Sequence, residues 1–131
     1  MGAFINGIGN ISPQSTFGNN DLLSSIKSYS DNRLTAIEPD YSEWIDPKLL
    51  RRMSRIIKMG VASAMCTLKE ASIEKPDAII TGTAYGCLED TGIFLSKMIT
   101  NKEQALNPTP FIQSTHNTIG SQIALLLQCL E

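Results

Sequence analysis

The stretch "IDPKLLRRMSRIIKMGVASAMCTLKEA" (residues 45–71) carries the clearest helical pattern in this sequence of 131 residues. Asp46 can accept hydrogen bonds from the free amides of a first helical turn, and Pro47 suits the first helical position because its missing N–H costs nothing there. Apolar residues then recur at helical spacing from Leu49 to Leu68. The pattern predicts one long helix that begins at Pro47 and ends near residue 71.

The two halves of this predicted helix differ in character. Residues 60 and 62–64 are Gly, Ala, Ser and Ala, so another backbone can approach the second half closely. The first half carries Arg51, Arg52, Arg55 and Lys58. We interpret these cations as a solvated basic face, and a docking patch for an acidic protein or a phosphate-bearing group is the alternative.

A strand and a helix are predicted downstream. Residues 78–81 form a short apolar run typical of a buried strand, and Gly82 and Gly86 bracket a tight crossing into a helix. Glu89 and Asp90 fall in the first turn of that helix, where carboxylates complement the positive end of the helix dipole. Its expected buried stripe consists of Leu88, Ile93, Phe94, Leu95, Met98 and Ile99.

The C-terminal part is expected to turn at residues 107–110 and to continue as an extended or irregular segment. Asn117 or Thr118 then caps a helix that is apolar on nearly every side, from Ile119 to Leu127. Such a helix is expected to be central in a fold.

The N-terminal residues 3–11, "AFINGIGNI", predict a strand that runs into a turn at Gly7 and Gly9. A small nucleotide-binding α/β module that uses this pair is an alternative, although Ser12 stands where a third glycine is needed. Residues 14–44, rich in Ser, Asn and Asp, are expected to form a surface excursion or lid, with a short helix at residues 21–29. Together the elements predict an α/β fold.

Composition limits the classes of function. The formal net charge of −2 gives no support for a protein that coats nucleic acid or an anionic membrane. No apolar stretch is long enough to span a bilayer, and the N-terminus lacks a basic region followed by an apolar run. We therefore expect a cytoplasmic protein without nucleic-acid partners.

The three cysteines, Cys66, Cys87 and Cys129, are odd in number and lack paired spacing, and His116 is the single histidine. They match no zinc pattern, so neither a metal nor a cofactor is predicted. Cys87 suggests a nucleophile, because helix amides at a strand-to-helix turn can lower a thiol pKa. Carboxylates follow at once and oppose a thiolate, so a packed thiol is the favoured interpretation, and His116 is interpreted as a hydrogen-bonded turn residue.

Four segments resemble β-ketoacyl synthases, in matching order. "INGIGNISP" resembles their opening strand and turn, and "LLRRMSRIIKMGVASAMCTLKEA" resembles their first long helix, with its Arg-Met-x-Arg step. "AIITGTAYGCLEDT" is similar to their second strand and glycine turn, and "NPTPFIQSTHNTIGSQIALLL" to a later turn and buried helix. The resemblance covers nearly the whole chain except residues 14–44.

This resemblance implies a layered, thiolase-like α/β fold, of which residues 1–131 form an N-terminal part that ends before the nucleophile strand and helix. Leu130 and Glu131 are interpreted as a cloning remnant. The implied reaction is condensation of an acyl thioester with a malonyl unit on acyl carrier protein, in fatty-acid, polyketide or polyene synthesis. The catalytic residues of that family fall outside this chain, so we expect it to be inactive alone.

The resemblance also implies a few site residues and partners. Phe111 matches a position that can line an acyl pocket, with core packing as the alternative, and Asn117 and Gly120 match a turn at a subunit contact. A homodimer, or a heterodimer with another synthase subunit, is implied. The alternative function is a non-catalytic homologue that pairs with an active subunit. An N-terminal part that ends at this point would leave apolar surface uncovered, which predicts self-association or a rearranged fold.

Overall fold

The computed structural model describes residues 2–18 and 25–129. Within these residues the regular structure is entirely helical, and no β-strand occurs. The elements are the short 3₁₀ helix η1 (Tyr41–Glu43) and the α-helices α1 (Pro47–Leu50), α2 (Arg55–Ala71), α3 (Leu88–Thr100), α4 (Pro108–Gln113) and α5 (Thr118–Leu126).

The predicted α/β fold is therefore wrong, and with it the layered thiolase-like architecture. Residues 3–11 and 78–81 have the composition of strands, but the described chain gives them no neighbouring strand and no ladder. A strand needs partners for its backbone groups and a surface on which to bury one face. Neither condition is met in the described chain. No strand lies beside these segments, and their apolar side chains are not buried, since Phe4 is 86% exposed and Ile80 is 94% exposed.

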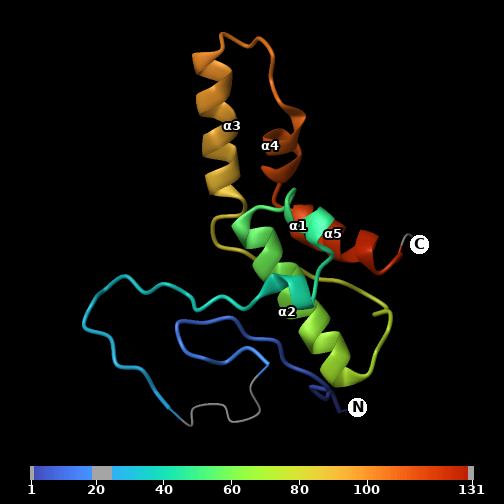
Figure 1. Ribbon diagram of the computed structural model, residues 1–131. Helices are drawn as coiled ribbons and strands as arrows, with labels where there is room; N and C mark the ends of the chain where they lie inside the picture. The colour runs from blue at the N-terminus through green and yellow to red at the C-terminus, as the bar shows by residue number, and fades with distance from the viewer. Residues whose placement is uncertain (1, 19–24, 130–131) are drawn as a thin grey trace.

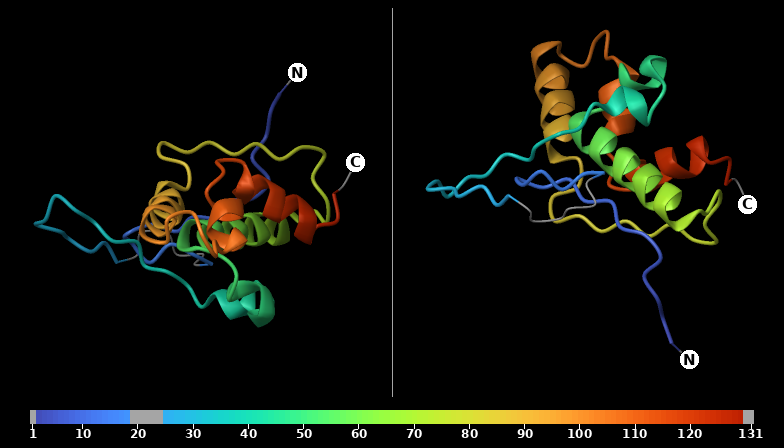
Figure 2. Two further views of the ribbon diagram at one scale, coloured as in Figure 1. Left: turned by 90° about the horizontal axis from the view of Figure 1, so that it is seen from above. Right: turned by 60° about the horizontal axis from the view of Figure 1, so that its bottom comes forward.

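Two helix pairs organise the molecule (Figure 1). α5 packs against α2, and α4 packs against α3. The α3–α4 pair extends from one end of α2, whereas residues 25–40 form a long loop that extends away from the helices (Figure 2). α2 therefore connects the two pairs, and it contributes more buried core residues than any other helix.

The core forms where α2 meets α5. Ile57 and Val61 of α2 are almost completely buried, and Ile119 and Ile123 of α5 pack into the same cluster. Full burial of one such side chain contributes about 1.5–3 kcal/mol. Gly60 permits the contact, because a β-carbon at this position would lie 2.5 Å from Cγ2 of Ile119. The close approach predicted for the small-residue part of the helix, residues 60–64 (the narrow face of α2), is thus confirmed.

The N-terminal segment crosses this same narrow face. A β-carbon at Gly7 would lie 2.4 Å from the backbone oxygen of Thr67, and one at Gly9 would lie 2.3 Å from that of Ser63. Between the two glycines, the amide of Ile8 donates a hydrogen bond of 2.6 Å to the Glu70 carboxylate. The missing side chains of Gly7 and Gly9 therefore allow the extended N-terminal segment to pass in close contact with the backbone of α2.

The single long helix predicted over residues 47–71 is broken. Asp46 caps the first piece by accepting from the Lys48 amide at 2.7 Å, as expected, but α1 ends at Leu50 and α2 begins at Arg55. Ser54 has extended dihedrals, with φ −71° and ψ 167°. At the break, the side-chain amide of Gln113 donates a hydrogen bond to the backbone carbonyl of Arg52, which therefore has a partner although the helix does not continue.

The later helices agree only in part with expectation. α3 begins at Leu88 with Glu89 and Asp90 in its first turn, as predicted, but its apolar stripe is largely exposed. α4 forms where an irregular segment is predicted, because Asn107 caps it by accepting from the Thr109 amide at 2.9 Å. α5 buries one face only, so it is not the central helix expected.

The excursion or lid predicted at residues 14–44 is irregular chain over residues 14–18 and 25–40, and the segment ends in η1. Of the short helix expected at residues 21–29, residues 25–29 are not helical and the remainder lies outside the described residues, as do Leu130 and Glu131. Phe17 packs edge-on against Trp44, with ring centroids 5.3 Å apart, which attaches the start of the excursion to its end.

Candidate functional site

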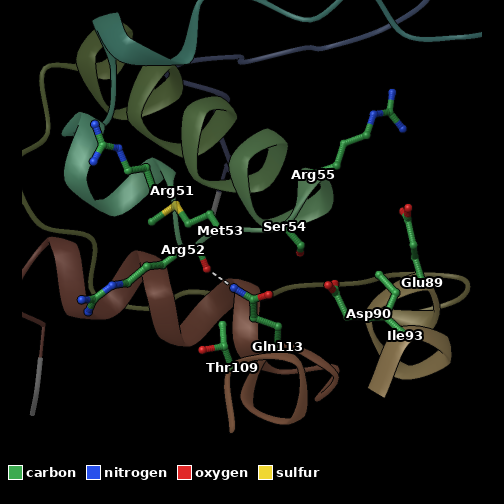
Figure 3. Close-up of a pocket in the computed structure, with 10 residues that line it drawn as sticks. All are labelled: Arg51, Arg52, Met53, Ser54, Arg55, Glu89, Asp90, Ile93, Thr109 and Gln113. Carbon is green, nitrogen blue, oxygen red and sulfur yellow. Dashed lines mark hydrogen bonds between the residues drawn. The ribbon is translucent and has the colours of Figure 1, made fainter. Parts of the chain in front are cut away.

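A cavity of about 280 Å³ lies at the N-terminus of α2 (Figure 3). Its wall combines the turn between α1 and α2, the first turn of α3, and α4. The break in the predicted long helix creates this site, because it exposes a fresh helix N-terminus in the middle of the basic stretch. The first turn of α2 contains no acidic residue, so its positive end is not compensated from within the helix.

Ser54 contributes a polar atom with no partner. It occupies the N-cap position of α2, yet its side chain makes no capping hydrogen bond. Its Oγ is buried and has no hydrogen-bond partner among the described residues. A buried hydroxyl without a partner is costly, so this atom marks a place where a ligand group or a water would be stabilised.

Asp90 faces the same space. Its residue is only 6% exposed, and within the described chain no hydrogen bond or ion pair reaches its carboxylate. Figure 3 shows the Ser54, Asp90 and Gln113 side chains directed toward one another across the cavity. The amide nitrogen of Gln113 already donates to the Arg52 carbonyl. The interior of the site is therefore lined by oxygen atoms.

Arginines surround this interior. Arg51, Arg52 and Arg55 all line the cavity, and their guanidinium groups extend outward in different directions (Figure 3). Arg55 forms an ion pair of 2.5 Å with Glu38, which raises the pKa of Arg55. Arg51 and Arg52 form no ion pair with the described residues. Glu89 lines the cavity as well, so the site combines two carboxylates with three arginines.

Cys87 lies near this site but lacks the properties of a nucleophile. Its side chain is packed, at 3% exposed, just before the first turn of α3. Burial raises the pKa of the Cys87 thiol, and the negative charge of Asp90 raises it further. The thiolate is accordingly disfavoured at neutral pH, as the sequence predicts.

The remaining candidates from the sequence do not assemble a reactive centre. His116 lies in a turn, where a β-carbon at Gly86 would be 3.5 Å from its own, but its expected hydrogen bond is absent from the described contacts. Cys66 is buried in α2, and Cys129 is half-buried near the end of the described chain. No three of the described His, Cys, Asp and Glu residues come together as a metal set.

The site residues implied by the resemblance fall on two helices, Phe111 on α4 and Asn117 and Gly120 at the start of α5. Phe111 of α4 is half-exposed and packs on Phe94 of α3, with ring centroids 5.3 Å apart. Asn117 is the exposed N-cap of α5. Gly120 faces residues 79–81, and a β-carbon there would lie 3.4 Å from Oγ1 of Thr81. Phe111 thus supports the α3–α4 pair, and Gly120 supports packing within this chain.

Comparison with protein-family models, curated proteins and solved structures finds no match to this chain. The likeness to β-ketoacyl synthases therefore rests on the quoted motifs. Among the described helices, none combines the length and apolar character needed to cross a membrane.

The cavity at the start of α2 is not anticipated by the sequence, because its polar residues lie far apart in the chain. Asp90 has a sufficient explanation as a helix-dipole residue, and Gln113 falls in a segment expected to be irregular. Ser54 is the residue that carries a usable signal. A serine followed by an apolar run is a helix-start pattern, and it competes with continuation of the helix from Pro47.

Proposed function

We propose that this chain works within a β-ketoacyl synthase-type condensing system and contributes binding surface to it, while the nucleophile is supplied by other polypeptide. The reaction of the whole system is condensation of an acyl thioester with a malonyl unit held on acyl carrier protein. The proposal takes the reaction class from the ordered motifs, and it takes the non-catalytic role from the thiols of this chain.

One observation carries the role as a binding surface. Among the described residues, the four most exposed large apolar side chains lie in or directly beside the two segments that resemble synthase strands: Phe4 and Ile5 at the first, and Ile80 and Tyr85 in the second. Exposed apolar surface of this kind favours an interaction site, because contiguous apolar patches are rare on the surface of monomeric proteins. Coverage of these segments by a synthase-type polypeptide would remove this apolar surface from water.

The thiols support the second half of the proposal. A condensing nucleophile must be largely ionised and accessible to a thioester. Cys66 and Cys87 are buried, and the pKa of Cys87 is raised. No described side chain acts as a base toward either sulfur, since neither thiol hydrogen-bonds to a histidine or a carboxylate.

The glycine pair gives the nucleotide-binding alternative no support. Both glycines lie against the backbone of α2, and residues 10–18 form bends and turns where a phosphate-binding helix would have to begin. Packing against α2 is sufficient to explain why residues 7 and 9 are glycines.

The test is purification of the tagged protein from its native source, followed by an assay for malonyl-carrier condensation. We expect condensing activity to co-purify with the chain through successive columns, and the recombinant chain alone to have none. A chain that purifies without condensing activity, or that condenses substrates by itself, contradicts the proposal.

A further inference from the structure

One face of α3 carries an apolar seam that no other helix covers. Leu88, Gly92, Leu95 and Ile99 follow one another at spacings of four, three and four residues, which is the heptad spacing of helices that pair side by side. Leu88 is 61% exposed, Leu95 44% and Ile99 75%. We propose that these four residues, the α3 seam, pair with the same seam of a second copy of this chain, with the two α3 helices antiparallel.

The α3 seam is distinct from the face by which α3 is attached to its own chain. Phe94 packs on Phe111 of α4, and the Thr91 hydroxyl donates to the Ser114 carbonyl at 3.3 Å. Because an α-helix has about 3.6 residues per turn, Thr91 and Phe94 point to one side of the seam. The α3–α4 pair projects from one end of α2 (Figure 1), so a second helix can reach the seam.

Gly92 leaves room in the middle of the seam for close approach. A β-carbon at this position would meet nothing within 4 Å, so packing within the chain does not require a glycine. Glycine inside a helix is less stable than alanine by about 1 kcal/mol. A bulky side chain of a neighbouring helix, placed against residue 92, explains why this position is small.

The order of the seam residues makes the seam complementary to itself. In an antiparallel pair with the two-fold axis between residues 93 and 94, Leu88 lies opposite Ile99 of the second copy. Leu95 then lies opposite Gly92 of the second copy, so a large side chain fills the space beside a missing one. A two-fold interface requires such a match, because the same patch is used on both copies.

A hollow at one end of the seam fits this arrangement. It measures about 320 Å³ and is lined by Met98, Ile99, Lys102 and Glu103. In the antiparallel pair, Leu88 of the second copy lies opposite Ile99 and therefore at this hollow. The two-fold axis repeats the contact at the other end of the pair, so both leucines are removed from water.

The charges of α3 favour the antiparallel orientation. Glu89 and Asp90 lie in its first turn, and Lys97 lies in its last turn. Parallel helices would place both acidic first turns side by side, where their carboxylates repel one another. Antiparallel helices place the acidic first turn of one copy at the level of Lys97 of the other, and they bring opposite ends of the two helix dipoles together.

The length of the seam limits the strength of the dimer. Stable interfaces bury about 1,200–2,000 Å² in total, and a seam of three helical turns presents less. We therefore expect a dissociation constant of about 1–100 μM. Sedimentation equilibrium of the full chain over this concentration range measures it. A chain that stays monomeric throughout overturns the proposal and leaves the seam to a different polypeptide.

Variants assign the association to the α3 seam. Leu95→Asn and Ile99→Asn should each weaken the dimer at least about tenfold, because a polar group then lies in the seam. Both side chains are exposed in the single chain, so the melting temperature of dilute protein should change by only a few degrees. Ile26→Asn is the matched control, since Ile26 is 68% exposed on the loop of residues 25–40. Equal weakening by Ile26→Asn overturns the assignment.

Disulfide mapping tests the orientation. Copies that carry Leu88→Cys are mixed with copies that carry Ile99→Cys, and the mixture is oxidised and mapped by mass spectrometry. We expect the new disulfide to join residue 88 of one copy to residue 99 of the other, a link that association through other apolar surface does not produce. A disulfide that joins residue 88 to residue 88, or the absence of any link between these positions, overturns the antiparallel pairing. The result does not depend on the condensing role.

Discussion

The backbone of Gly9 rests on the backbone oxygen of Ser63, so closely that a β-carbon at residue 9 would lie 2.3 Å from that oxygen. An extended chain is thereby held against the narrow face of α2 without a sheet. The contact joins two segments that resemble synthase motifs, and it leaves Phe4 and Ile5 exposed. The same crossing thus explains both the glycines and the uncovered apolar surface.

Replacement of Gly9 by alanine should therefore lower the free energy of unfolding by about 1–3 kcal/mol, because the added methyl group forces the segment away from α2. The measurement is urea unfolding followed by circular dichroism at 222 nm, a wavelength that reports helix content. Gly82→Ala is the matched control, since a β-carbon there meets nothing within 4 Å. Equal stability of the two variants would show that the Gly9 crossing is loose.

The cluster of Glu38, Tyr41 and Arg55 should make stability depend on pH. The Tyr41 hydroxyl donates to Glu38 at 2.7 Å, and this bond and Arg55 together lower the pKa of Glu38 below its ordinary value of 4.5. A lowered carboxyl pKa stabilises the fold fully above pH 4.5, and the contribution disappears as the pH falls through the folded-state pKa. The group is partly exposed, so the effect is below about 1 kcal/mol.

Glu38→Gln provides the control for this dependence. The stability difference between wild-type protein and the variant should be largest near neutral pH and should shrink as the solution is acidified below pH 4.5. Urea midpoints measured across this range test the expectation. A difference that grows on acidification contradicts the assigned direction of the pKa shift.

The cysteines should differ in their rates of alkylation. Cys129 is half-buried, whereas Cys87 is packed and its thiol pKa is raised by burial and by Asp90. We expect Cys129 to react with iodoacetamide at least about tenfold faster than Cys87 under native conditions, because reaction requires an accessible thiolate. Peptide mapping by mass spectrometry gives the rates. Faster labelling at Cys87 would restore the nucleophile hypothesis for that residue.

Substitution of an exposed isoleucine and of a buried isoleucine should have different effects on stability and on self-association. Ile80→Asn should change the free energy of unfolding by less than about 0.5 kcal/mol but should weaken self-association, because this side chain is 94% exposed. Ile57→Ala should cost about 2–5 kcal/mol, since Ile57 lies in the core. Chemical unfolding and sedimentation velocity measure the two effects. Substantial destabilisation by Ile80→Asn would show that residues 78–81 are buried in solution.

The helices could be anticipated from local pattern to different extents. The cap at Asp46 and the start of α3 depend on residues close in sequence, and both are correctly predicted. At the break before Ser54, the helix-start signal of the serine competes with continuation of the helix, and the tertiary bond from the Gln113 side chain to the Arg52 carbonyl is not visible in the sequence.

The two strand predictions are wrong because strand formation also depends on tertiary contacts. The apolar runs at residues 3–11 and 78–81 have strand-like composition, but a strand forms only when other strands satisfy its backbone. The site at α2 is missed because Ser54, Asp90 and Gln113 come together only after three helices pack. By contrast, the narrow face of α2 is visible directly in the run from Gly60 to Ala64, because side-chain size alone determines it.

The most direct test of the proposed division of labour between this chain and a synthase-type partner is acyl trapping in whatever complex is purified with the chain from its native source. The complex is treated with a radiolabelled acyl thioester without malonyl carrier, and the acylated polypeptide is then identified by mass spectrometry. The account predicts that the label lies on a cysteine of another polypeptide and that this chain remains unmodified. A stable acyl group on Cys66, Cys87 or Cys129 would contradict it.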